Sequence, residues 1–349
     1  MRRLGFVVST TILWLLGATI ASAEVAYKIV TASERGTYIQ IGRDLARFVA
    51  PDADISLDVL PSAGSAENVR RLRYESGVKL ALVQSDVYQA FLDQAAAGNA
   101  DAANLIRPLR VIMPLYDEEI YFFVRADSPL EYIDQIKGKR INVGPMGSGT
   151  ALTATTLYRQ MFNEPLAEGQ AGFLTNEEAL VSLLQEDKVD VVAVVAGQPA
   201  KLLTDMKPES RQFIKLLKFD PRNPASQAAL KTYFSTTVRA INYPNLLDED
   251  LPALSVKAYL VTYDYNLKDT QAHLAKLARS LCRNFVSLQA SGHPKWREVE
   301  VSLPALGRGW AYYPPTEKEL RSCPNGRLPG VAARPRSCSQ QERVLGLCD

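Results

Sequence analysis

Short runs of β-branched and aliphatic residues alternate with longer amphipathic segments along most of this chain, and the alternation restricts the fold more than any other feature. The first part of the pattern predicts strands over 27–31, 55–60 and 80–83 and helices over 38–49, 66–74 and 86–97. Alternation of strands and helices is typical of a sheet whose strands run parallel. The sequence therefore predicts an α/β fold, a mostly parallel sheet with helices on both faces.

The pattern starts again after residue 108. It predicts further strands over 109–115, 120–125, 140–143, 189–195 and 255–263, and further helices over 133–136, 151–162, 177–185 and 270–290. A chain of 349 residues is longer than the roughly 250–300 residues at which one core stops growing. We therefore expect two lobes, with the chain crossing between them near 122–125 and 240–256.

The N-terminus has the three parts of a secretory signal. Arg2 and Arg3 precede an apolar run over 4–20, and Ala21-Ser22-Ala23 follows as a small-residue cleavage site. The alternative is an uncleaved membrane anchor, but the run is marginally short for a full span. We expect residues 1–23 to be a signal peptide that is cleaved after Ala23, which makes the protein periplasmic.

The remaining chain divides into three expected parts. Lobe 1 would comprise 24–122 and 256–321, lobe 2 would comprise 123–255, and 322–349 would form a Cys-rich C-terminal tail. Export favours disulfides, and the four candidates are Cys282, Cys323, Cys338 and Cys348. Four cysteines allow three pairings, which the sequence leaves open. A metal site is the alternative, but no CxxC pair or nearby histidine supports it.

Composition argues against several classes of function. Lys plus Arg number 40 against 38 Asp plus Glu, so nothing indicates a nucleic acid as partner. Only His273 and His293 are present, which leaves little for a zinc site or a His-based triad. A hydrolase built on Ser148 lacks both a base and a GxSxG motif. We expect no enzyme activity and no cofactor, and we expect the acidic residues 117–119 to form a solvated turn between two strands.

Four segments that follow predicted strands are rich in small polar residues: 32–38, 61–68, 84–86 and 147–150. Each opens a predicted helix, where unpaired backbone N–H groups and the helix dipole favour an anion. Ser33, Ser65, Ser85 and Thr150 could alternatively do no more than cap their helices. Because ligands of open α/β sheets bind beyond the carboxyl ends of the strands, the recurrence of such segments favours a binding site.

These segments together resemble the solute-binding proteins of TRAP transporters, specifically the TAXI family. The family's Gly-Ser-x-x-Gly-x-Tyr, Gly-Ser-x-Glu-Asn and Gln-Ser-Asp motifs are matched by 32–38 (Ala-Ser-Glu-Arg-Gly-Thr-Tyr), 64–68 and 84–86. Its second-lobe motif is matched by 136–140 and 144–150 (Gly-Pro-Met-Gly-Ser-Gly-Thr), and a later Gly-x-Pro by 197–199. Ala32 and Arg35 depart from the family pattern, and no His-Pro-Gly-Ala-like ending is present.

The resemblance implies a two-lobed periplasmic-binding-protein fold with a hinged cleft between the lobes. It also implies that the protein captures a small organic carboxylate or an amino acid such as glutamate and delivers it to the membrane permease of a TRAP transporter. By motif, one wall of the cleft would carry Ser33, Thr37, Tyr38, Ser65, Asn68, Gln84 and Ser85, and the other Ser148, Gly149, Thr150 and Gly197. Arg35 would be either an additional cation for a ligand carboxylate or a solvated residue.

A different use of the same cleft stays open at this level. An exported sensor or adaptor subunit would bind a ligand in the same way and report it to a membrane receptor. The altered ending of the chain makes this alternative reasonable, and the sequence does not distinguish the two roles.

Overall fold

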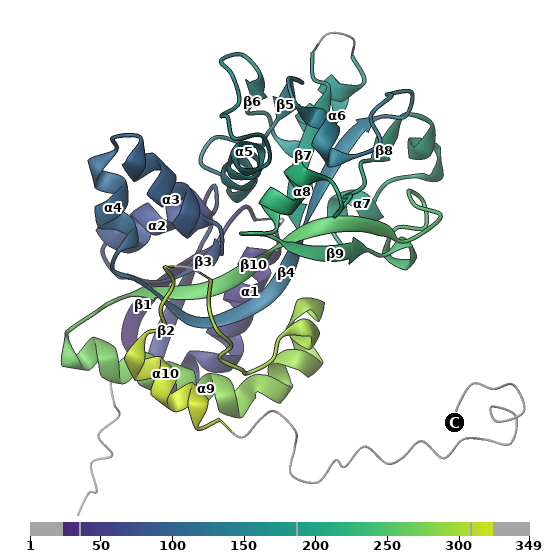
Figure 1. The fold of residues 1–349 in the computed structure, drawn as a ribbon. Coiled ribbons are helices and arrows are strands. Elements are labelled where there is room, and N and C mark those ends of the chain that lie inside the picture. Colours follow the sequence, from purple (N-terminus) through teal and green to yellow (C-terminus); the bar gives the residue numbers. More distant parts are fainter. Residues whose placement is uncertain (1–23, 35, 186–187, 308, 324–349) are drawn as a thin grey trace, which may run out of the picture.

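The computed structural model describes residues 24–34, 36–185, 188–307 and 309–323 (Figure 1). The predicted signal peptide, Arg35, Cys338 and Cys348 lie outside these ranges. The strands are β1 (Val25–Val30), β2 (Ile55–Leu60), β3 (Val78–Gln84), β4 (Leu109–Arg125), β5 (Ile141–Asn142), β6 (Ala171–Gly172), β7 (Val191–Ala196), β8 (Ile214–Leu216), β9 (Phe234–Val238) and β10 (Leu251–Tyr263).

The predicted helices are present in the predicted order. The α-helices are α1 (Thr37–Asp44), α2 (Ser65–Tyr74), α3 (Val87–Ala96), α4 (Ala100–Ile106), α5 (Gly149–Phe162), α6 (Asn176–Leu183), α7 (Lys201–Thr204), α8 (Pro224–Ala229), α9 (Lys268–Ser291) and α10 (Pro314–Arg321). Among these, α4, α7, α8 and α10 are helices for which the sequence pattern makes no prediction. The shorter π or 3-10 turns are η1 (Leu45–Val49), η2 (Pro51–Ala53), η3 (Ile133–Ile136), η4 (Pro208–Gln212), η5 (Ala240–Asn242) and η6 (Pro294–Glu298). None of the described helices is long and apolar enough to cross a membrane.

One mixed sheet runs through both lobes in the order β2-β1-β3-β10-β4-β7-β5-β6, with β8 on β4 and β9 on β10. Lobe 1 contains β1 to β3, which pair in parallel, and lobe 2 contains β5 to β9, of which β5, β6 and β7 pair in parallel. The long strands β4 and β10 are antiparallel to each other and to their other neighbours, and they connect the lobes (Figure 1). The predicted two-lobed α/β fold is confirmed.

The first connecting strand corrects one expectation. Residues 117–119 do not form a solvated turn between two strands, because β4 continues through them from Leu109 to Arg125. Glu118 and Glu119 are 5% and 3% exposed. A strand that serves both lobes has both faces covered, so even charged residues in its middle are buried. The expected boundaries between the lobes, after 122 and before 256, stay predictions, since β4 and β10 belong to both.

Alternate residues of the strands pack on opposite faces of the sheet. In lobe 1, Leu80 and Leu82 contact a core under α1, α9 and α10, whereas Ala81 and Val83 contact a core under α2, α3 and α4. In lobe 2, alternate residues of β4 enter two separate cores in the same way. This period of two follows from strand geometry and gives each lobe helices on both faces of its sheet.

The C-terminal segment is fastened to lobe 1. A disulfide joins Cys282 of α9 to Cys323, with their Cα atoms 5.7 Å apart. Trp310 packs edge-on against Tyr259 of β10, with ring centroids 5.1 Å apart, and its indole N–H donates to the Ser85 carbonyl at 2.8 Å. The segment after α9 therefore packs along lobe 1 up to the last described residue.

Candidate functional site

The loop before α2 and the loop before α5 bring the two lobes into contact. Gly64 lies in the left-handed region, with φ 130°, and a Cβ atom placed on it would lie 2.8 Å from the backbone nitrogen of Gly149. Only a residue without a side chain permits this approach. The first turns of α2 and α5, which belong to different lobes, therefore meet.

Gln84, the last residue of β3, adds a side-chain contact between the lobes. Its Oε1 accepts hydrogen bonds from Ser65 Oγ at 3.2 Å and from Thr153 Oγ1 of α5 at 3.5 Å. A Cβ atom on Gly149 would lie only 2.1 Å from the same Oε1. Ser65, Gln84 and Gly149, three of the residues predicted from motifs, are thus brought together by the fold.

Asp86 and Tyr233 make a second buried connection. The Tyr233 hydroxyl, from the segment before β9, donates to Asp86 Oδ2 at 3.0 Å and approaches the Thr153 carbonyl at 3.2 Å. Asp86 is fully buried, and burial raises the pKa of its carboxyl to about 6, against the opposing effect of hydrogen bonds from Thr153 and Tyr233. We call Gln84, Asp86, Gly149, Thr153 and Tyr233 the closing contact.

A second polar group lies where β4 passes between the lobes. The Tyr38 hydroxyl, from the first turn of α1, donates to Glu118 Oε2 at 2.8 Å. Burial raises the pKa of the Glu118 carboxyl to about 8, although Tyr38 and the positive charge of Lys295 oppose the shift. Glu118 is therefore largely protonated at neutral pH.

Lys295 of η6 is a buried cation in the same group, with 1% of its surface exposed. Its ammonium donates to Glu298 Oε2 at 2.6 Å and to the Asp117 carbonyl at 3.2 Å. It also lies 5.6 Å from the centroid of the Tyr116 ring, within reach of a cation–π interaction. Gly197 of lobe 2 packs against the Lys295 side chain, and a Cβ there would lie 2.5 Å from its Cε.

Glu119 connects the same strand to lobe 2. Its carboxylate accepts from the Gln198 backbone N–H at 2.7 Å and from Gln198 Nε2 at 2.8 Å. Burial raises the pKa of the Glu119 carboxyl, while Lys295 and Gln198 act against the shift. We call Tyr38, Glu118, Glu119 and Lys295 the hinge cluster.

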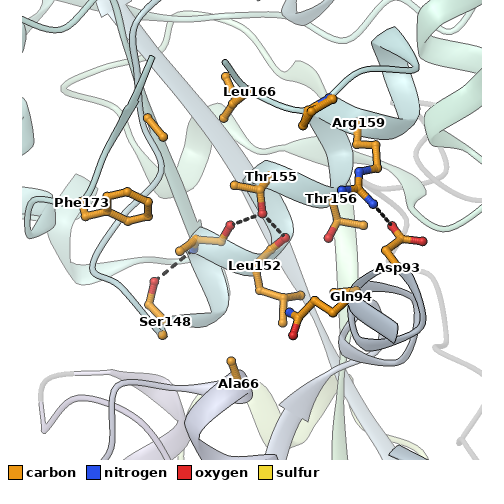
Figure 2. Close-up of a pocket in the computed structure, with 15 residues that line it drawn as sticks. Ala66, Asp93, Gln94, Ser148, Leu152, Thr155, Thr156, Arg159, Leu166 and Phe173 are labelled. Carbon is orange, nitrogen blue, oxygen red and sulfur yellow. Dashed lines mark hydrogen bonds and ion pairs between the residues drawn. The ribbon is translucent and has the colours of Figure 1, made fainter. Parts of the chain in front are cut away.

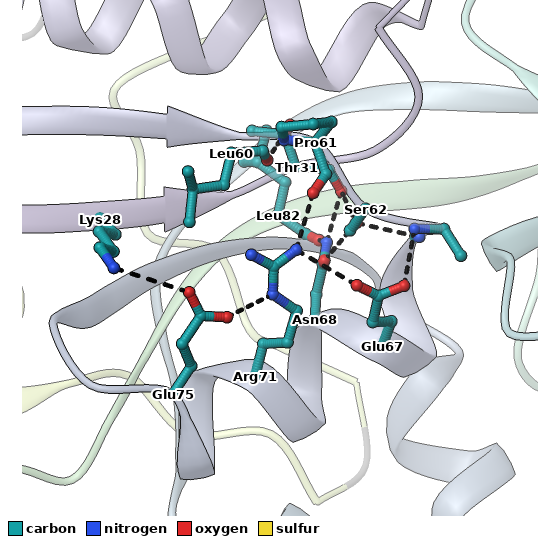
Figure 3. Close-up of polar contacts among 12 residues, drawn as sticks. Lys28, Thr31, Leu60, Pro61, Ser62, Glu67, Asn68, Arg71, Glu75 and Leu82 are labelled. Carbon is teal, nitrogen blue, oxygen red and sulfur yellow. Dashed lines mark hydrogen bonds and ion pairs between the residues drawn. The ribbon is translucent and has the colours of Figure 1, made fainter.

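Several residues predicted as ligand contacts have bonds within their own lobe. Asn68 donates to the Thr31 carbonyl at 2.5 Å and to the Leu82 carbonyl at 2.7 Å, and it is fully buried, so it joins the ends of β1 and β3 (Figure 3). Arg71 Nη1 donates to the Pro61 carbonyl at 2.7 Å and steadies the loop that leads to α2. Asn68 and Arg71 therefore hold the loop that leads to α2 in place.

The other predicted residues cap or brace their loops. Ser148 Oγ accepts from Ala151 N at 3.0 Å and caps α5, while Thr150 Oγ1 accepts from Val195 N at 3.3 Å. Ser85 Oγ accepts from Lys257 N at 3.2 Å. Ser33 is exposed, and Thr37 is half-buried at the start of α1.

A pocket of about 450 Å³ opens beside the closing contact, between α3 and α5 (Figure 2). Its walls are mostly apolar, and the charged side chains on them are Asp93 of α3 and Arg159 of α5. Ser148 belongs both to this pocket and to the predicted site, and Gly147 beside it also lines the pocket. No motif predicts the pocket, since its walls come mainly from one face of α3 and one face of α5, together with residues near 66 and 165–173.

Motif reasoning missed Glu118, Lys295, Thr153 and Tyr233. A run of three acidic residues indicates a surface turn, and Lys295 and Tyr233 stand in segments without any motif. Among the residues of the closing contact that were not predicted, only Asp86 had a signal, because it is the last residue of the Gln-Ser-Asp motif.

Comparison with known proteins identifies the family. Residues 29–301 match the model of the NMT1-like family, and the chain belongs to it.

Similar solved structures include XAC2383 from Xanthomonas citri bound to ATP, at 14% identity and a TM-score of 0.43, over 85% of this chain and 95% of that one. The arginine-, lysine-, histidine-binding protein ArtJ from Geobacillus stearothermophilus is 14% identical, with a TM-score of 0.45. The match covers 82% of this chain and 99% of ArtJ. The periplasmic sulfonate-binding protein SsuA from Methylobacillus flagellatus KT is 10% identical, with a TM-score of 0.45. The match covers 85% of this chain and 77% of SsuA. Similarity this distant does not transfer a ligand.

Proposed function

We propose that this protein is an exported solute-binding subunit of a TRAP-type transporter, which captures a small organic carboxylate or an amino acid by closure of its two lobes. The observation that carries the proposal is the contact between the first turns of α2 and α5, where Gly64 and Gly149 touch. Helix N-termini from two lobes that converge on one point form a place where an anion can be held from both sides. A ligand held by both lobes selects the closed arrangement.

The hinge cluster supports the ligand class. The Tyr38 hydroxyl donates to Glu118 and the charge of Lys295 is compensated by Glu298, so this buried group presents no free negative charge that would repel an anion. The arrangement is compatible with a zwitterion or a carboxylate of modest charge as ligand.

The TAXI resemblance of the loops is the support for delivery to a permease. Three of the segments on which the resemblance rests, 64–68, 84–86 and 144–150, lie at or beside the closing contact. Ser65, Gln84, Ser148 and Gly149 are the residues that we propose for the ligand site. Thr37, Tyr38, Thr150 and Gly197 would complete its walls, Ser33 would lie at its rim, and Asn68 and Ser85 would hold its loops in place.

The proposal is tested with protein purified from the periplasm without refolding. Native mass spectrometry should find a small molecule bound to the wild type, and thermal shift with glutamate, other amino acids, succinate and lactate should give a ligand that raises the melting temperature. No bound molecule together with no response to any member of the panel would overturn the proposal.

The Gly149→Val variant supplies the mechanistic test. Its side chain would meet Gln84 of the other lobe, so closure should be blocked and affinity for the identified ligand should fall at least about tenfold. Valine is strained little at this position, because Gly149 has ordinary helical geometry. Gly307→Val is the control, because Gly307 is an exposed glycine outside the left-handed region and a Cβ on it would meet only Trp310, at an ordinary contact distance of 3.8 Å.

A further inference from the structure

The pocket between α3 and α5 has walls from both lobes and stands apart from the hinge cluster. Lobe 1 contributes Ala66, Asp93 and Gln94, and lobe 2 contributes Leu152, Arg159 and Phe173 (Figure 2). Pockets of roughly 300–1,000 Å³ with apolar walls and few polar groups are the usual form of small-molecule sites. The volume of about 450 Å³ falls within this range.

The apolar part of the pocket is formed on lobe 2. Leu152 and Leu166 lie on the wall, and Phe173 projects from the opposite side with 45% of its surface exposed (Figure 2). An exposed aromatic ring beside a cavity loses contact with water when a ligand fills that cavity. The wall is therefore suited to an aromatic or branched hydrocarbon group.

The pocket also has a positive charge. Arg159 Nη1 lies 3.5 Å from Asp93 Oδ2, longer than the roughly 2.7–2.9 Å of a direct charge-assisted hydrogen bond. Asp93 also accepts a hydrogen bond from Gln89 at 2.8 Å, so its carboxylate is not held by the arginine alone. A carboxylate that entered the pocket could accept two hydrogen bonds from this guanidinium in the bidentate geometry that arginine favours.

We propose that this pocket is a second binding site, which takes a monocarboxylate with an aromatic or branched apolar body. The carboxylate pairs with Arg159, and the apolar body packs against Leu152 and Phe173. Because α3 and α5 belong to different lobes, an occupant contacts both and stabilises their association. The pocket shares Ser148 with the ligand site proposed above, but Arg159, Leu152 and Phe173, on which this proposal rests, are not residues of that site.

Isothermal titration calorimetry with phenylacetate, 4-methylpentanoate and the uncharged analogue 2-phenylethanol tests the proposal. The wild type should bind at least one of the two acids, and 2-phenylethanol more weakly. Arg159→Gln should weaken binding of the acid about tenfold or more, whereas Phe173→Ala should weaken binding of phenylacetate and 2-phenylethanol by similar factors.

Asp93→Asn separates a binding role of Arg159 from a purely structural one. This variant also breaks the ion pair between the lobes but frees the guanidinium, so the acid should bind at least as tightly as to the wild type. Arg222→Gln, which removes an exposed arginine that pairs with Asp220 in lobe 2, is the matched control and should leave binding unchanged.

Three results would overturn the proposal: no binding of either acid by the wild type, equal losses in Arg159→Gln and Asp93→Asn, or binding that Arg159→Gln leaves intact. The last result would place the acid elsewhere, for example in the cleft. Gln84→Ala then distinguishes the sites, because Gln84 belongs to the proposed ligand site and does not line the pocket; it should reduce binding in the cleft, while the response to Arg159→Gln reports on the pocket. Failure of one proposal therefore leaves the other testable.

Discussion

The hinge cluster and the closing contact both join the two lobes, but they do so with different chemistry. The hinge cluster contains buried charges, and its residues lie on or against β4, which runs unbroken through both lobes. The closing contact consists of hydrogen-bonding side chains, one of them the carboxyl of Asp86, and of glycine, and none of the described strands runs through it from one lobe to the other. Buried charges are costly to separate from their partners, whereas a few neutral hydrogen bonds exchange with water at little net cost. The hinge cluster is therefore suited to stay together while the closing contact opens.

The largest effect is expected from removal of the buried cation. Lys295→Met keeps the length of the side chain but leaves the carboxylates around it without their positive partner. We expect the free energy of unfolding to fall by about 3 kcal/mol, measured by urea denaturation. Lys318→Met, an exposed lysine of α10, should change it by less than about 0.5 kcal/mol. Equal stability of the two variants would contradict a structural role for the hinge cluster.

Glu118 should give the protein a pH-dependent stability. A carboxyl whose pKa rises on folding binds its proton more tightly in the folded state, so the free energy of unfolding falls as the pH rises from about 4.5 to about 8. Glu118→Gln keeps an acceptor for Tyr38 and removes this titration. At pH 8.5 it should be more stable than the wild type by at least about 1 kcal/mol. Parallel stability curves of the two proteins from pH 5 to pH 8.5 would show that the shift is absent.

The smallest effect is expected at the closing contact. Tyr233→Phe removes the hydroxyl that donates a hydrogen bond to Asp86. The contact between the lobes should weaken by about 1 kcal/mol, which is roughly a fivefold change in the equilibrium constant between the closed and open arrangements. Small-angle X-ray scattering should then show a larger radius of gyration than that of the wild type, with global stability little changed. Tyr312→Phe, which loses a hydroxyl bond to the Pro304 carbonyl within lobe 1, should leave the radius unchanged.

Much of the fold could be predicted because hydrophobic periodicity marks most elements. The strand expected over 55–60 is β2 at both ends, and the helices expected over 151–162 and 270–290 differ from α5 and α9 by at most two residues at either end. Three elements had a weak signal: α4 is a short alanine-rich helix next to a turn, β8 has three residues, and β9 is largely polar. Each is defined by its packing partner more than by its own sequence.

The candidate site was only partly predictable. Gly64 and Gly149 had a signal because close approach of two backbones requires glycine, and motifs preserve that requirement. Asn68 was predicted as a ligand contact, and what the structure shows for it is a bridge between β1 and β3 within lobe 1. A motif indicates that a side chain is needed, and the structure shows which atoms it contacts.

The sequence by itself determined the order of strands and helices, the two-lobed α/β architecture and the places where glycine allows close approach. The order and type of the elements depend mainly on interactions between residues near each other in the chain, and the glycines are recognisable because they stand in motifs. Only the tertiary structure decided that Glu118 is buried, that Lys295 reaches the Asp117 carbonyl from 178 positions away, and that Tyr233 meets Asp86 from 147 positions away. Burial and charge pairing depend on which distant segments pack together, and local sequence patterns do not record that.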